Sequence, residues 1–108
     1  MRKELRVKKS QEFSEIMNYK RYYNSDVMTL YVKPKKEETN RVGLSVGKKI
    51  GNAVVRNKVK RQVRMMVQET YIYEENFDTI ILIRKKFIEV SYDSNKKVLE
   101  MLLKKVRI

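Results

Sequence analysis

The sequence predicts an α+β fold, a small two-layer sandwich whose elements follow the order α-β-β(-β)-α-β-α. Three segments place apolar residues at helical spacing, and three others have the composition of strands and lie between turn or loop signals. A chain of 108 residues also has the length of one domain with one hydrophobic core. We therefore expect residues 1–108 to form a single domain.

The first helix is predicted from Ser10, whose hydroxyl can act as the N-cap, to about Tyr19. Phe13, Ile16 and Met17 recur at i, i+3 and i+4 within this segment, so they lie on one side of the helix. We expect this side to pack against the rest of the domain.

Two strands are expected next. The polar stretch 20–26 ends in the turn signal Asn24-Ser25-Asp26, and residues 27–32 are rich in strand-forming side chains. A charged loop then leads to a second strand at 41–46, which we expect to turn back against the first as a hairpin.

The second strand has one face suited to packing and one face that is nearly bare. The bare face is formed by Gly43, Ser45 and Gly47. Small residues allow another group to approach the backbone closely. This face can therefore be the floor of a groove or the seat of a tightly packed helix, and the sequence favours neither.

The second half of the chain is predicted to contain two helices and one strand. A long helix runs from about Asn52 to Gln68, a third strand occupies 77–84, and a final helix runs from Ser94, as its N-cap, to about Lys105. The aliphatic centre of the third strand indicates burial on both faces, so we do not expect it at a free edge of the sheet.

Charge is the strongest functional signal in the composition. The chain has 26 Lys and Arg against 13 Asp and Glu, which gives a net charge of +13 and a pI of about 10.0. Such a domain is expected to bind a polyanion, because each cation placed near a phosphate releases condensed counterions. Nucleic acid is the leading candidate, and an anionic membrane surface or charge that serves only solubility are the alternatives.

The composition also excludes several classes of protein. Cysteine and histidine are absent, which removes disulfides, thiol nucleophiles and thiolate metal sites. The longest aliphatic run, Ile80 to Ile83, is far shorter than the roughly 20 residues that a membrane helix needs. The N-terminus has no apolar stretch behind its positive charges, as a secretory signal would have, so we expect a cytoplasmic protein.

The segment 41–68 concentrates the positive charge. It contains no Asp or Glu, and its basic residues are Arg41, Lys48, Lys49, Arg56, Lys58, Lys60, Arg61 and Arg64. On a helical wheel at about 100° per residue, apolar residues occupy one arc and basic residues the neighbouring arc, with Asn57 among them. Lys48, Lys49 and Asn52 lead into the helix N-terminus, whose free N–H groups also favour phosphate. We expect this face to bind nucleic acid, because no acid in the segment neutralises it; a merely solvated basic face is the alternative.

The ordered run from Arg41 to Arg61 resembles the signature of a known family. It reads RVGLSVGKKIGNAVVRNKVKR, and Arg56-Asn57 with Lys60-Arg61 and Arg64 resembles the basic-helix motif of the bacterial ribonuclease P protein component. Further matching positions are Leu5-Arg6-Val7-Lys8-Lys9, Glu12-Phe13 and Tyr31.

The resemblance implies a left-handed βαβ crossover around the basic helix, against the general right-handed preference. It also implies that the helix binds the catalytic RNA subunit, through the matching residues Lys48, Lys49, Asn52, Arg56, Asn57, Lys60, Arg61 and Arg64. A cleft between the first helix and the sheet would hold the single-stranded 5′ leader of precursor tRNA and would be lined by Phe13, Met17 and Tyr31. Aromatic rings suit a leader of varied sequence, because every base has a π-face. Met17 stands where an aromatic residue is common in the family, and helical spacing alone would assign Phe13 and Met17 to the core.

No catalytic residues are expected in the protein itself. Phosphodiester hydrolysis commonly uses two metal ions held by carboxylates, whereas the acids of this chain are scattered and none lies in the basic motif. Glu37-Glu38 and Glu74-Glu75 are adjacent pairs, which is a weak signal for a metal site. The resemblance implies that the RNA subunit carries Mg²⁺ and the catalysis, while the protein assists substrate binding.

These expectations combine into one function, the protein subunit of ribonuclease P, which assists endonucleolytic removal of the 5′ leader. The expected partners are the catalytic RNA and precursor tRNA, with no membrane involved and the protein monomeric in the holoenzyme. Two alternatives remain open at this point. A small basic ribosomal protein, or another structural RNA-binding protein, would share the size and charge, and a protein-only nuclease would cleave precursor tRNA without an RNA subunit.

Overall fold

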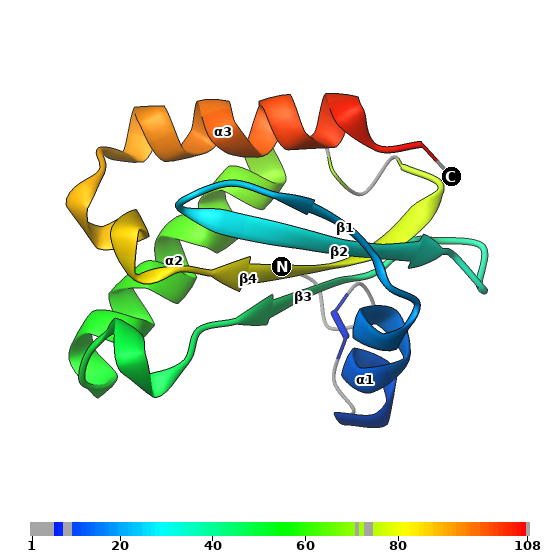
Figure 1. Cartoon of the computed structure of the whole chain (residues 1–108), viewed down its shortest axis with the longest axis horizontal. Coiled ribbons are helices and arrows are strands. Elements are labelled where there is room, and N and C mark those ends of the chain that lie inside the picture. Colours follow the sequence, from blue (N-terminus) through cyan, green and yellow to red (C-terminus); the bar gives the residue numbers. More distant parts are fainter. Residues whose placement is uncertain (1–5, 8–9, 71, 73–74, 108) are drawn as a thin grey trace.

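The computed structural model describes residues 6–7, 10–70, 72 and 75–107 (Figure 1). Its elements, in chain order, are α1 (Ser10–Asn18), β1 (Arg21–Asn24), β2 (Met28–Pro34), β3 (Val42–Ser45), the 3-10 helix η2 (Lys48–Ile50), α2 (Ala53–Glu69), β4 (Phe77–Ile83), the 3-10 helix η4 (Lys85–Glu89) and α3 (Tyr92–Lys105). The predicted α+β class and the order of the elements are confirmed, and the strand that the prediction left optional is present.

β4 is a central strand of a four-stranded sheet with the order β1-β2-β4-β3. It pairs antiparallel with β2 and parallel with β3. Ile80 and Ile81 point to opposite faces of the sheet, and both are fully buried. The prediction that this aliphatic strand is not a free edge is confirmed.

The predicted hairpin between β2 and β3 is wrong, because β4 lies between these strands. The most apolar strand needs a partner on each edge, and β2 and β3 supply them. The loop after β2 is fastened instead to the start of β4. Buried Asn40 in this loop donates from Nδ2 to the carbonyl oxygens of Ile72, at 2.8 Å, and Phe77, at 3.0 Å.

The stretch 20–26, expected only as a polar turn region, contains strand β1. Lys20 has a φ of 64°, and this left-handed conformation lies where the chain passes from α1 to β1. Tyr22 pairs in register with Tyr31, and Tyr23 packs against the main core. The two adjacent tyrosines were the strand signal, and their polar and charged neighbours obscured it.

The sheet separates two hydrophobic clusters. α2 and α3 cover one face and enclose the main core, and α1 lies against the other face (Figure 1). The smaller cluster, under α1, has Val7, Ile16 and Ile80 as its buried members. The predicted sandwich therefore consists of the sheet with α2 and α3, and α1 is added on the opposite side.

The connection from β3 through α2 to β4 is a left-handed crossover. In Figure 1 both strands run to the left, β4 lies above β3, and α2 passes behind the sheet. Nearly all connections between parallel strands of one sheet have the opposite hand. The structure therefore has the unusual crossover that the resemblance implied.

The N-caps of the two long helices are polar side chains. Asn52 caps α2, as its Oδ1 accepts a hydrogen bond from the Val55 N–H at 3.0 Å. α3 is capped by Ser91 rather than by the predicted Ser94, because the Ser91 Oγ accepts from the Ser94 N–H at 3.2 Å. Both serines satisfy the local pattern, but Ser94 stands at the position whose N–H receives the cap.

Candidate nucleic-acid interface

α2 turns its basic residues away from the core. Val59, Val63, Met66 and Val67 are the buried residues of this helix. We use the term α2 surface for the exposed and half-buried residues of its basic motif, which are Arg56, Asn57, Lys60, Arg61 and Arg64.

The cations of the α2 surface have no acidic partner in the part of the chain that the structure describes. The ion pairs found there involve other basic residues, namely Lys33, Lys36, Arg41, Lys86 and Lys96. The one acid of α2, Glu69, stands at the last position of the helix, where it pairs with Lys96 on α3. The α2 surface therefore presents positive charge that the described residues do not neutralise.

Arg56 lies nearest to the packed side of α2. It is half-buried, and its Nε is buried without a hydrogen-bond partner among the described residues. A buried donor without an acceptor costs about 1–3 kcal/mol. An acceptor brought by a ligand, such as a phosphate oxygen, would offset this cost.

A first groove, of about 300 Å³, lies between the N-terminal segment, β3 and α2. Phe13 from α1 and Gly43 from β3 line it together with Lys60 and Arg64 from α2. An aromatic ring of the predicted leader-binding set and two cations of the α2 surface thus line the same groove.

Phe13, Met17 and Tyr31 are the residues predicted to bind the leader, and we keep the term leader cleft for this predicted set. All three pack against the small cluster under α1, and all three remain partly exposed. None is a fully buried core residue. Their apolar sides support α1, while their remaining surface is open to a ligand.

Gly43 allows Phe13 to approach β3 closely. An ideal Cβ at this position would lie 2.9 Å from Phe13 Cζ and 2.7 Å from Ile80 Cδ1. By contrast, a Cβ at Gly47 would meet nothing within 4 Å. Both alternatives for the bare face therefore hold at Gly43, which packs closely against α1 and also lines the first groove, whereas Gly47 lies beyond the end of β3 and lines the second groove without close contacts.

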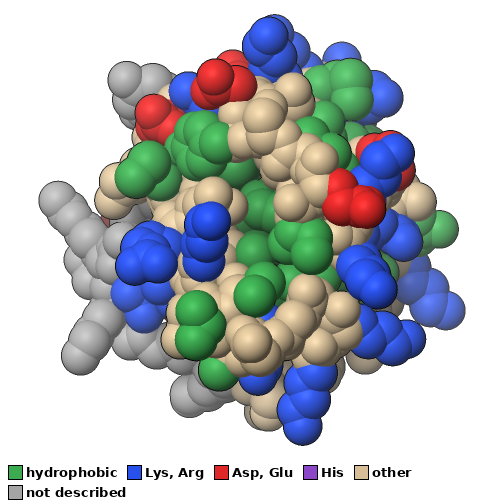
Figure 2. Space-filling view, turned by 90° about the vertical axis from the view of Figure 1, so that its left-hand side faces the viewer, with side chains coloured by type: hydrophobic (Ala, Val, Ile, Leu, Met, Phe, Trp, Pro, Cys, Tyr) green, Lys and Arg blue, Asp and Glu red, His purple; other side chains and the backbone are tan. Residues whose placement is uncertain are grey.

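A second groove, of about 780 Å³, opens at the C-terminal ends of β3 and β4. Its lining includes the apolar side chains of Ile50 and Leu82 and the basic residues Lys48, Lys49, Arg84 and Lys85. Figure 2 looks onto this end of the molecule and shows hydrophobic side chains in the middle with lysine and arginine side chains around them. Sequence reasoning missed Arg84 and Lys85. The available signal was a pair of cations directly after a buried strand, at the sheet end where Lys48 and Lys49 also lie.

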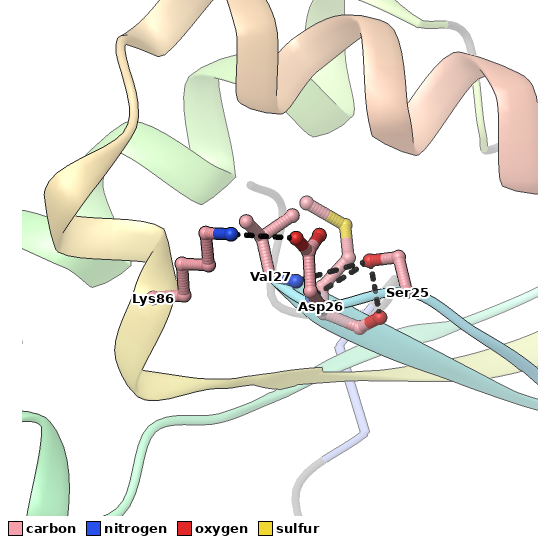
Figure 3. Close-up of polar contacts among 5 residues, drawn as sticks. Ser25, Asp26, Val27 and Lys86 are labelled. Atoms are coloured by element: carbon pink, nitrogen blue, oxygen red, sulfur yellow. Dashed lines mark hydrogen bonds and ion pairs between the residues drawn. The ribbon is translucent and has the colours of Figure 1, made fainter.

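Lys86, the next cation in the chain, is neutralised. Its Nζ lies 3.0 Å from Asp26 Oδ2 in the turn between β1 and β2 (Figure 3). The hydrogen bond and the charge of Lys86 lower the pKa of Asp26. Ser25 shapes the same turn, as its Oγ accepts from the Val27 N–H at 3.2 Å. Lys86 therefore adds little free charge to the second groove.

Comparison with known proteins identifies the family. The family model described as Ribonuclease P matches residues 1–107. The chain belongs to the ribonuclease P protein family. The ribonuclease P protein component of Mycoplasma capricolum subsp. capricolum is 44% identical over 103 residues, which cover 94% of each chain. That of Bacillus velezensis is 42% identical and aligns with 100% of this chain and 94% of its own.

Solved structures agree with this assignment. The RNase P protein of Staphylococcus aureus superposes with a TM-score of 0.83 at 31% identity, covering 93% of both chains. The RNase P protein from Thermotoga maritima has the same TM-score of 0.83 at 24% identity, which supports the fold alone. Family membership makes this chain a protein component of ribonuclease P, a ribonucleoprotein of tRNA processing. Across the described residues, no helix is both long and apolar enough to cross a membrane.

One cation of the ribonuclease P signature has a structural role. Arg41 forms an ion pair with Glu12 of α1, and its backbone N–H donates to Asp78 Oδ1 at 2.7 Å. Burial raises the pKa of Asp78, although the hydrogen bond and the charge of Arg41 oppose the shift. The segment 41–68 contains no acid, but Glu12 outside it pairs with Arg41, so this cation connects α1 to the sheet.

The acids that the structure describes are not clustered. No group of three or more acidic side chains that could hold a metal ion occurs within the described ranges. Glu37 and Glu38 are exposed loop residues, whereas Glu74 of the second predicted pair lies outside the described residues, as do Leu5, Lys8 and Lys9 of the N-terminal match. We therefore assign no step of the reaction to an ion held by the described carboxylates.

Proposed function

We propose that this chain binds the catalytic RNA of ribonuclease P through the α2 surface and the residues that lead into α2. The proposed contacts are Lys48, Lys49, Asn52, Arg56, Asn57, Lys60, Arg61 and Arg64. The observation that carries the proposal is the row of α2 cations, which face outward without acidic partners among the described residues. Each cation that neutralises a phosphate releases a counterion, so this surface favours RNA most at low salt. Asn52 would contribute through its amide N–H groups, since its Oδ1 already caps α2.

The leader cleft is proposed to hold the single-stranded 5′ leader of precursor tRNA. Support comes from the partly exposed side chains of Phe13, Met17 and Tyr31, and from the position of Lys60 and Arg64 beside Phe13 in the first groove. Proteins that bind single strands combine aromatic stacking with a cationic groove that follows the backbone. The arrangement therefore suits a ligand whose bases are unpaired.

In this proposal the protein positions the substrate and lowers the repulsion between phosphates, and it has no catalytic residue. The RNA subunit carries Mg²⁺ and the cleavage that yields the mature 5′ end of tRNA. A metal ion at such a site stabilises charge on the phosphate and activates the attacking water. We further infer that the protein acts in the cytoplasm as a monomer within the holoenzyme.

The contact of α2 with RNA is tested by the salt dependence of binding. Arg61→Ala should weaken affinity for the catalytic RNA and reduce the slope of log K against log salt by about 1, as expected for one lost phosphate contact. Lys97→Ala removes an exposed cation of α3 and serves as the matched control, with affinity and slope expected unchanged. An unchanged slope for Arg61→Ala, or an equal change for both variants, would contradict the assignment.

The leader cleft is tested separately. Phe13→Ala should weaken binding of precursor tRNA more than binding of mature tRNA by the holoenzyme. Equal losses for both substrates would assign Phe13 to packing only. Cleavage of precursor tRNA by the protein in an RNA-free preparation would overturn the assignment of the chemistry to RNA.

A further inference from the structure

Tyr22 is 57% exposed although it belongs to a strand. It lies on the edge strand β1, directly opposite Tyr31 of β2. The two ring centroids are 5.7 Å apart, with the planes tilted by 43°. Aromatic rings attract one another at this separation. Tyr31 thus holds the Tyr22 ring in place, while more than half of the residue stays open to solvent.

Tyr22 and the leader cleft share one face of the sheet. Tyr31 stands between Tyr22 on one neighbouring strand and Ile80 on the other. Ile80 is buried under α1 in the cluster on which the leader cleft rests. Because adjacent strands are about 4.8 Å apart, Tyr22 extends the cleft by one strand toward the edge of the sheet.

A fixed cation lies farther along the same face. Arg84 donates from Nη2 to Asn24 Oδ1 at 3.0 Å and from Nε to Thr29 Oγ1 at 3.2 Å. Asn24 and Thr29 are opposite each other, two residues along from the tyrosine pair, which corresponds to about 7 Å. Neither partner is charged, so Arg84 keeps its positive charge and has further N–H groups for another acceptor.

We propose that Tyr22 stacks a nucleotide of the single-stranded leader beyond the nucleotides held in the leader cleft, and that Arg84 contacts an adjoining phosphate. Asn24 and Thr29 are positioning residues, because they fix the guanidinium above the sheet. The inference rests on the proposed function of the leader cleft and adds a distal subsite at the β1 edge. Stacking on Tyr22 makes binding depend on leader length, since only a leader long enough to cross Tyr31 reaches this ring.

The test uses the reconstituted holoenzyme and precursor tRNAs whose leaders are lengthened one nucleotide at a time. Tyr22→Thr keeps a strand-forming residue and removes the ring, and Tyr22→Phe keeps the ring. Loss of one stacked base weakens binding by at least about fivefold. Tyr22→Thr should therefore weaken the longer-leader substrates by at least this factor and leave the shortest leaders and mature tRNA unchanged, whereas Tyr22→Phe should behave like the native protein. Met101→Thr, at an exposed position of α3, is the surface control and should change none of these affinities.

Two results would overturn the inference. One is a loss for Tyr22→Thr that is the same at every leader length, and the other is no loss at any length. Phe13→Ala, measured in parallel, separates this inference from the proposal on which it rests. If the affinity lost through Phe13→Ala depends on the leader and the affinity lost through Tyr22→Thr does not, only the distal subsite is refuted. If neither substitution causes a loss of affinity that depends on the leader, the leader cleft itself is refuted.

A second measurement does not rely on Tyr22→Thr folding as well as the native chain. The fluorescence of 2-aminopurine falls when the base stacks, so the probe is placed at successive leader positions and bound to holoenzyme with Tyr22 or Tyr22→Leu. Quenching at one distal position that disappears with Tyr22→Leu supports the subsite. Equal fluorescence with both proteins at all positions refutes it.

Discussion

Replacing Gly43 with alanine tests how closely α1 packs on the sheet. The added methyl group would lie 2.7 Å from Ile80 Cδ1, 2.9 Å from Phe13 Cζ and 3.0 Å from Val7 Cβ. Ordinary carbon–carbon contacts are about 3.5–4.0 Å, so each of these atoms would have to move by roughly 0.5–1 Å. Ile80 lies in the central strand, and the shift should therefore fall mainly on Phe13 and the N-terminal segment.

The expected loss for Gly43→Ala is about 1–3 kcal/mol in the free energy of unfolding, the usual range for overpacking a filled site. For a domain of this size, each kcal/mol lowers Tm by about 4–8 °C. Thermal and urea denaturation followed by circular dichroism would measure both quantities. Displacement of Phe13 should also weaken binding of precursor tRNA more than binding of the catalytic RNA.

Gly47→Ala is the matched control for this experiment. A Cβ at Gly47 meets nothing within 4 Å, and its φ of −77° and ψ of 168° are accessible to alanine. The unfolded chain loses freedom, so this variant should be more stable by about 0.4–1 kcal/mol. A Gly43→Ala protein as stable as the native one, or equal destabilisation by both substitutions, would refute the packing argument.

Two further predictions concern buried charge and helix capping. The pKa of Asp78 is raised above its ordinary value of 3.8, because burial favours the protonated carboxyl in the folded state. This preference stabilises the fold fully below pH 3.8, and the stabilisation is lost as the pH rises through the folded-state pKa. Asp78→Asn keeps the acceptor for the Arg41 N–H but cannot titrate, so it should flatten the dependence of the unfolding free energy on pH above 3.8. Asp78→Ala removes the acceptor and should lower the unfolding free energy by about 1–3 kcal/mol at neutral pH. An unchanged pH profile for Asp78→Asn would contradict this reasoning. Ser91→Ala should lower the free energy of unfolding by about 1 kcal/mol through loss of the α3 cap, and Ser94→Ala should lower it by clearly less. A larger loss for Ser94→Ala than for Ser91→Ala in urea denaturation would identify Ser94 as the cap.

Local signals explain which parts of the fold were predictable. α2 was predicted because its apolar period and the Asn52 cap lie within the segment itself. Strand pairing is non-local, and no local pattern places β4 between β2 and β3, since the two parallel partners are separated by the whole of α2. β1 was missed because Tyr22 and Tyr23 form only a short strand signal between a helix end and a turn.

The candidate site divides in the same way. The basic row of α2 could be predicted, because residues three and four apart share one side of a helix. The approach of Phe13 to Lys60 and Arg64 depends on how the crossover places α2 beside β3, and no spacing in the sequence encodes it. Arg84 joins the site only because β4 ends beside η2.

The unequal size of the two hydrophobic clusters has a dynamic consequence. Under α1 the buried members are Val7, Ile16 and Ile80, whereas α2 and α3 share a much larger cluster on the other face. Regions with few buried apolar contacts open at lower free energy than the global core, and their amide protons exchange sooner. α1 should therefore open and reclose while α2 stays folded. Under the proposed function, the protein would then remain attached to the catalytic RNA through α2 while α1 repacks around each new substrate.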